Sequence, residues 1–104
     1  LVRQAHALED LGCFAIVLEC VPAQLAARIT SELALPTIGI GAGPDCDGQV
    51  LVLHDMLGVY PRPSPKFSKN FMQGAASPEA AVKAYVAAVK SGAFPGPEHG
   101  FYTT

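Results

Sequence analysis

The sequence predicts an α/β fold built around a parallel sheet. An unbroken apolar run at residues 13–18 is typical of a strand that is buried on both faces, and the run at residues 37–41 predicts a second buried strand. Segments with helical spacing of their apolar residues stand before and between these runs, and a third apolar run follows at residues 49–53. This alternation indicates helices that cover a parallel sheet.

The first expected element is a helix over residues 1–11, which ends at Gly12 because glycine readily takes the left-handed conformation found after helices. Since the sequence opens inside this helix, we expect an N-terminal part of the protein to be lost or to lie on another chain. The strand at residues 13–18 follows directly, and Glu19 stands at its carboxyl end.

A second helix is expected to start at Pro22, whose ring suits the first helical turn. Leu25, Ile29 and Leu33 recur every four residues and predict one buried stripe. The strand at residues 37–41 comes next, so the order is strand, helix, strand.

We expect the run at residues 49–53 to be a third strand, with His54 and Asp55 at its carboxyl end, although its spacing also fits a short helix. Residues 59–77 hold several prolines and predict a loop with a short turn at 67–72.

The sequence Ser77-Pro78-Glu79 is typical of a helix start, and this helix should run to Ser91 and end at Gly92. Residues 94–104 are expected to form an extended arm.

Three strands are too few to close a barrel, which takes eight strands and about 250 residues. The chain is therefore expected to be either the last third of a barrel or a small open sheet. Half of its 104 residues are apolar and only 15% are charged, which favours a segment of a larger core or an oligomer.

The net charge of −2 gives no electrostatic footprint for nucleic acid or for an anionic membrane, so neither partner is expected. No apolar run approaches the roughly 18 residues needed to span a bilayer. The three cysteines are odd in number and form no CxxC pair, which favours reduced thiols in a cytoplasmic protein.

Glu19 is the candidate catalytic residue. It lies between an expected buried strand and the proline that starts the next helix, and in α/β barrels this junction forms the active-site face. The alternative is that Glu19 caps the following helix or pairs with a base outside this chain.

Two other motifs favour turns over ligand sites. The glycines at 39, 41 and 43 fail as a dinucleotide motif because position 44 is proline, so a tight turn with room for packing is expected. Asp45 and Asp47 suggest a calcium loop, but Gln49 and Val50 break the spacing that such a loop requires. No histidine has zinc-ligand spacing with a cysteine.

The loop after the third run carries three basic side chains interleaved with two phenylalanines, Phe67 and Phe71. Arg62, Lys66 and Lys69 could hold an anionic ligand, but a solvated loop with two aromatic anchors is the more common arrangement.

Taken together, these segments resemble one family, the ketopantoate hydroxymethyltransferases. The shared motifs are IVLECVP at 16–22, IGIGAG at 38–43, DGQVLVLHD at 47–55 and FPGPEH at 94–99, in this order, and PKF at 65–67 and KNF at 69–71 add to the likeness. The resemblance covers essentially the whole chain. One departure is Gly100, where the family usually has serine.

The resemblance implies that residues 1–104 are the C-terminal part, about the last three of eight strands, of one (β/α)8 TIM-barrel domain of the phosphoenolpyruvate/pyruvate type. It implies transfer of a hydroxymethyl group from 5,10-methylenetetrahydrofolate to 3-methyl-2-oxobutanoate in pantothenate biosynthesis. Glu19 matches the family's general base.

The resemblance further implies a Mg²⁺ ion, whose ligands are expected outside this chain, and a homo-oligomer, a decamer in the family. It also implies partnership with the N-terminal part of the barrel. The alternative is a non-catalytic fragment or interaction module.

Overall fold

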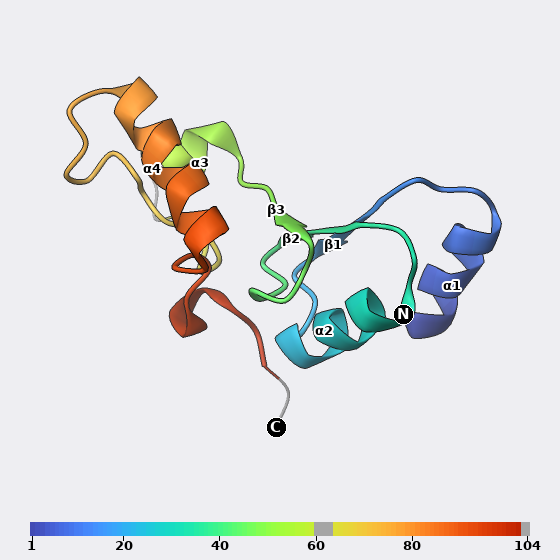
Figure 1. Cartoon of the computed structure of the whole chain (residues 1–104). Helices are drawn as coiled ribbons and strands as arrows, with labels where there is room; N and C mark the ends of the chain where they lie inside the picture. The colour runs from blue at the N-terminus through green and yellow to red at the C-terminus, as the bar shows by residue number, and fades with distance from the viewer. Residues whose placement is uncertain (60–63, 103–104) are drawn as a thin grey trace.

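A parallel sheet with two helices on one face forms one half of the molecule. The computed structural model describes residues 1–59 and 64–102. The strands β1 (Ile16–Glu19), β2 (Thr37–Ile40) and β3 (Gly48–Gln49) pair in the order β1-β2-β3, all parallel. Helices α1 (Val2–Asp10) and α2 (Ala23–Glu32) lie on the same side of the sheet (Figure 1). The expected α/β fold with a parallel sheet is confirmed.

The first hydrophobic core lies between these helices and the sheet. Ile16 and Leu18 of β1 pack against Ala5 of α1 and against Ala26 and Ile29 of α2. The predicted stripe on α2 is confirmed, since Ile29 is 1% exposed, Leu33 is buried and Leu25 packs against the same core. The periodic spacing of these side chains is what brings α2 onto the sheet.

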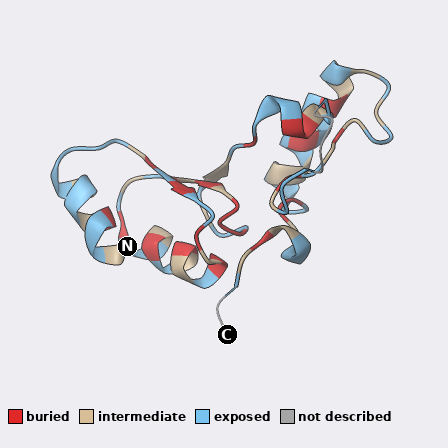
Figure 2. Ribbon diagram, turned by 180° about the vertical axis from the view of Figure 1, so that it is seen from behind, coloured by how far each residue is buried: buried red, intermediate tan, exposed pale blue. Residues whose placement is uncertain are grey.

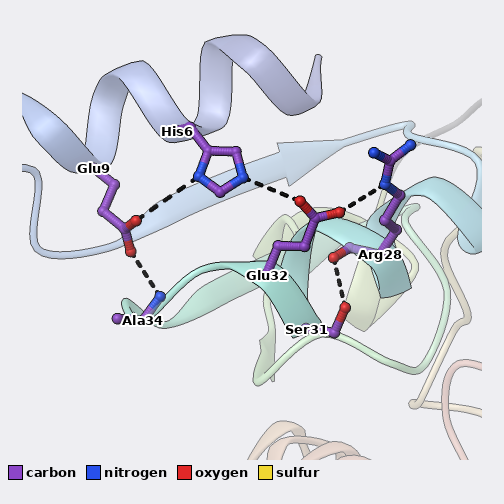
Figure 3. A network of polar contacts seen from close by, with 6 residues as sticks. All are labelled: His6, Glu9, Arg28, Ser31, Glu32 and Ala34. Carbon is purple, nitrogen blue, oxygen red and sulfur yellow. Dashed lines mark hydrogen bonds and ion pairs between the residues drawn. The ribbon is translucent and has the colours of Figure 1, made fainter.

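Polar contacts also join α1 to α2 (Figure 3). His6 contacts Glu32 at 3.1 Å, and the Arg28 guanidinium donates to the other oxygen of Glu32 at 2.6 Å. The Glu9 carboxylate accepts the Ala34 N–H at 2.6 Å, just after α2. His6 therefore lies on the helix surface and helps to hold the two helices together.

The other half of the molecule has its own core. It contains α3 (Leu53–Leu57), α4 (Pro78–Ser91) and the short 3-10 helix η1 (Pro97–His99). Buried residues therefore form two separate groups, one around the sheet and one around α4 (Figure 2). In the second, the ring of Phe71 contacts Tyr85 and Phe94 edge-on, with 5.4 Å between centroids in both pairs.

The predicted α4 is confirmed at both ends. The Ser77 hydroxyl accepts the Ala80 N–H at 3.1 Å, and Gly92 takes the left-handed conformation with φ of 82°. No helix in the described ranges is long and apolar enough to cross a membrane.

The predicted third strand is wrong over most of its length. Strand β3 is only Gly48–Gln49. The last hydrogen bond to β2 runs from the Val50 N–H to the Gly39 carbonyl at 3.0 Å, and the chain then leaves the sheet. The alternative of a short helix holds from Leu53 onward, so His54 and Asp55 lie in α3 and not at a strand end. The reason is tertiary, because Leu51 and Met56 are buried in the second core.

The first strand is also shorter than predicted, and it is not buried on both faces. Burial alternates along Ile16–Glu19, Val17 is 59% exposed, and Phe14 lies outside the strand. Helices α1 and α2 cover one face of the sheet, and Val17 on the other face remains exposed.

The expected extended arm at the C-terminus is not observed over its described part. Phe94 is 4% exposed in the second core, η1 follows, and the Phe101 carbonyl accepts the Ala23 N–H of α2 at 2.7 Å. These contacts join residues far apart in the sequence, so local patterns could not predict them.

Candidate active site

Glu19 is the last residue of β1 and lies on the open face of the sheet. It pairs in register with Ile40, the last residue of β2, at the carboxyl end of the strands. Side chains alternate along a strand, so Glu19 shares the face of the exposed Val17, whereas Ile16 and Leu18 point toward the helices. The carboxylate of Glu19 is exposed at this edge.

The capping alternative for Glu19 is not supported. Helix α2 has Pro22 at its N-cap and no side-chain hydrogen bond to its first turn. The first N–H of the helix, from Ala23, goes to the Phe101 carbonyl. The Glu19 carboxylate therefore does not serve the helix that follows it.

The chain turns sharply directly after Glu19. Cys20 has φ of 53°, and it is the one non-glycine residue with positive φ among residues 1–59 and 64–102. This conformation costs an ordinary side chain about 1–2 kcal/mol. The Cys20 N–H donates to the Ile40 carbonyl at 2.9 Å, which ends the pairing of β1 with β2. Nothing in the sequence signals this strained residue, because cysteine has no preference for left-handed backbone.

The glycines after β2 allow close packing at the same end of the sheet. Gly41 and Gly43 have φ of 71° and 82°. A Cβ on Gly41 would lie 3.1 Å from the Phe67 ring, and one on Gly43 would lie 2.6 Å from the Cβ of Ala23. The interpretation as a tight turn with room for packing is confirmed.

The aspartates of the next loop belong to a turn at the opposite end of the sheet. Asp47 accepts the Thr37 N–H at 2.9 Å, and its own N–H donates to the Thr37 hydroxyl at 3.2 Å. Thr37 is the first residue of β2, so this loop lies away from Glu19. In the described part of the chain, no three His, Cys, Asp or Glu side chains are grouped to hold a metal ion.

Cys46, which precedes Asp47 in this loop, packs against apolar side chains. Cys46 is half-buried against the first core, and burial raises the pKa of its thiol. A raised pKa keeps this thiol protonated, so it is a poor nucleophile.

Comparison with known proteins decides the family. The sequence profile of the ketopantoate hydroxymethyltransferases matches residues 1–97. The chain belongs to the ketopantoate hydroxymethyltransferase family. Its relatives include proteins named 3-methyl-2-oxobutanoate hydroxymethyltransferase from Burkholderia mallei, Burkholderia pseudomallei and Burkholderia thailandensis.

These three relatives are each 63% identical to this chain over 101 residues, which is 97% of the chain. The same residues span only 37% of each relative's own length. Most of the length of these ketopantoate hydroxymethyltransferases therefore has no counterpart in the present sequence.

In this family member, the basic loop residues contact aromatic rings. The Lys66 ammonium lies 4.9 Å from the centroid of the Phe101 ring, and that of Lys69 lies 5.1 Å from the centroid of Phe71. Phe71 is buried and Phe67 is half-buried, as expected for aromatic anchors of a solvated loop. Arg62 lies outside the described residues.

An apolar groove of about 450 Å³ lies between α1 and β1, apart from Glu19. Leu1 and Leu8 line it from the helix, and Ile16, Val17 and Leu18 line it from the strand. Because these three consecutive residues point to both faces of the sheet, the groove follows the edge of β1 that β2 does not occupy.

Proposed function

We propose that this chain is the C-terminal part of a (β/α)8 barrel that transfers a hydroxymethyl group from 5,10-methylenetetrahydrofolate to 3-methyl-2-oxobutanoate. The product would be 2-dehydropantoate. The observation that carries the proposal is Glu19, an exposed carboxylate at the carboxyl end of β1 on the open face of the sheet. In α/β barrels the active site lies at this end of the strands.

Two features support further strands around this sheet. Exposed apolar side chains on the open face, such as Val17 at 59%, suit the interior of a closed barrel. The groove along β1 is the place where a right-handed connection through α1 would put the preceding strand. We therefore propose that a strand from the remaining length of the protein pairs with β1 there.

The proposed chemistry begins with a proton transfer. The Glu19 carboxylate takes the proton from C3 of the keto acid, and the electron pair of the C–H bond becomes the C2–C3 double bond of an enolate. One water molecule hydrolyses the methylene group of the folate, so that both of its C–N bonds break, tetrahydrofolate leaves and formaldehyde is released in the site. The enolate carbon then attacks the formaldehyde carbon, and the C=O electron pair moves to the oxygen, which takes up a proton to complete the hydroxymethyl group. The base must lie within hydrogen-bonding reach of this proton, and an exposed carboxylate at the strand end has that freedom.

The negative charge on the enolate oxygen needs a metal ion or hydrogen-bond donors. The described residues of this chain do not fit Mg²⁺ beside Glu19, because Asp47 is engaged with Thr37 at the far end of the sheet. We propose that any Mg²⁺ ligands come from the rest of the protein.

Reconstitution tests the proposed function. This chain would be co-expressed with the preceding segment of the Burkholderia pseudomallei relative, and hydroxymethyl transfer would be assayed with and without Mg²⁺. We expect activity from the co-purified pair and none from either part, because the 104-residue chain leaves a sheet edge and an apolar face uncovered.

Two results would contradict the proposal. One is a monomeric 104-residue chain that melts cooperatively and is active alone. The other is a soluble, correctly assembled pair without activity, which would favour a non-catalytic interaction module.

A further inference from the structure

The turn that joins Glu19 to α2 is held by main-chain hydrogen bonds at both ends. The Cys20 N–H donates to the Ile40 carbonyl at 2.9 Å, within the sheet. The Ala23 N–H donates at 2.7 Å to the carbonyl of Phe101, which belongs to the C-terminal tail. The second bond brings the far end of the sequence to the residue that starts α2.

This second bond replaces a missing helix cap. The first N–H groups of a helix have no partner inside the helix. At the start of α2, the N-cap residue Pro22 makes no side-chain hydrogen bond to the helix, because its ring offers no acceptor. Ala23 is 4% exposed, so water has little access to its N–H. The Phe101 carbonyl supplies the acceptor that the local sequence lacks.

The tail is itself anchored upstream of this contact and at the contact. Upstream, Phe94 is buried in the second core, where its ring contacts Phe71 and lies 4.8 Å from the His99 ring. At the contact, the Lys66 ammonium lies over the Phe101 ring. The tail thus runs from the α4 half of the molecule to the start of α2 (Figure 1). Its carbonyl is fixed by contacts that do not involve α2.

We propose that Phe101 is a positioning residue for Glu19. By fixing the start of α2, it keeps the strained left-handed Cys20 in place and so sets where the adjacent Glu19 carboxylate lies at the strand end. Without the tail contact, the start of α2 can shift, Cys20 can relax to an ordinary conformation, and Glu19 moves with it. This inference rests on the proposed role of Glu19 as the base.

The test uses the complete enzyme in two truncated forms. One ends after Gly100 and lacks the Phe101 carbonyl, and the matched control ends after Tyr102 and keeps it. Amide hydrogen exchange at Ala23 reports the contact. Deuterium exchange into 3-methyl-2-oxobutanoate, without folate, reports the placement of the base.

For the form that ends after Gly100, we expect Ala23 to exchange at least about tenfold faster, as the loss of a buried hydrogen bond implies. We expect kcat for proton exchange to fall about 10- to 100-fold, since small displacements of a reacting group have effects of this size. KM should stay within about twofold, because Phe101 is not proposed to touch substrate. The control that ends after Tyr102 should match the wild type in Ala23 exchange, in kcat and in KM.

Unchanged protection of Ala23 would refute the contact, and lost protection with unchanged kcat would refute the positioning role. If the shorter form does not fold, Phe101→Gly serves instead, because it removes the ring under Lys66 and loosens the carbonyl. Phe101→Gly should also speed Ala23 exchange and lower kcat, by smaller factors, and the absence of both changes would overturn the proposal. Wild-type activity in Glu19→Gln would instead refute the proposed function. The hydrogen exchange of Ala23 would still decide whether the Phe101 carbonyl binds the start of α2.

Discussion

Substitution of Gly43 by alanine should strongly destabilise the protein, for two separable reasons. Gly43 has φ of 82°, a conformation that costs an alanine about 1–2 kcal/mol. Its new Cβ would also lie 2.6 Å from the Cβ and 3.2 Å from the Cα of Ala23. Because Ala23 begins α2, the clash can be relieved only by moving helix backbone, which typically costs about 1–3 kcal/mol.

The two costs together predict a loss of about 2–5 kcal/mol for Gly43→Ala. Two other glycines allow the conformational cost and the cost of the clash to be measured separately. Gly92 also has φ of 82°, but a Cβ there would meet nothing within 4 Å, so Gly92→Ala should cost only the conformational part, about 1–2 kcal/mol. Gly48 has neither feature, and Gly48→Ala should be nearly neutral.

Urea unfolding of the complete protein, followed by circular dichroism, would measure the three free energies. The expected order of destabilisation is Gly43→Ala, then Gly92→Ala, then Gly48→Ala. If Gly43→Ala costs no more than Gly92→Ala, the close approach of the glycine turn to α2 is wrong.

Two further predictions concern the helices. Hydrogen bonds, first from Arg28 and then from His6, hold the pKa of the Glu32 carboxyl below its ordinary value of 4.5. The stability that the Glu32 carboxylate contributes is therefore present above pH 4.5 and is lost as the pH falls through the lowered pKa. The difference in urea midpoint between wild type and Glu32→Gln should therefore shrink on acidification, and a difference that grows would contradict the network. Ser77→Ala should lower the free energy of unfolding by about 1 kcal/mol, because it removes the N-cap of α4. Ser91→Ala, whose exposed hydroxyl donates to the Ala88 carbonyl, is the control, and an equal loss there would contradict the capping role.

The parts of the fold that could be predicted from sequence depend on local patterns. The ends of α4 follow from Ser77 and Gly92, and the buried face of α2 follows from the spacing of Leu25, Ile29 and Leu33. The parts that were missed depend on distant contacts. The burial of Met56 draws the chain into α3, and that of Phe94 folds the tail back.

The candidate site was only partly predictable for the same reason. The place of Glu19 follows from the strand before it and Pro22 after it. The left-handed backbone of Cys20 has no signal in the sequence, and the contact of Phe101 with Ala23 joins opposite ends of the chain.

The most direct test of the account is proton exchange by Glu19→Gln in the complete enzyme. Deuterium incorporation into 3-methyl-2-oxobutanoate would be followed without folate, beside Glu79→Gln as a matched control on the exposed surface of α4. We expect Glu19→Gln to keep the wild-type melting behaviour and to slow exchange about 10²- to 10⁴-fold, the usual contribution of a general base, while the control exchanges normally. Wild-type exchange rates in Glu19→Gln would contradict the assignment of Glu19 as the base.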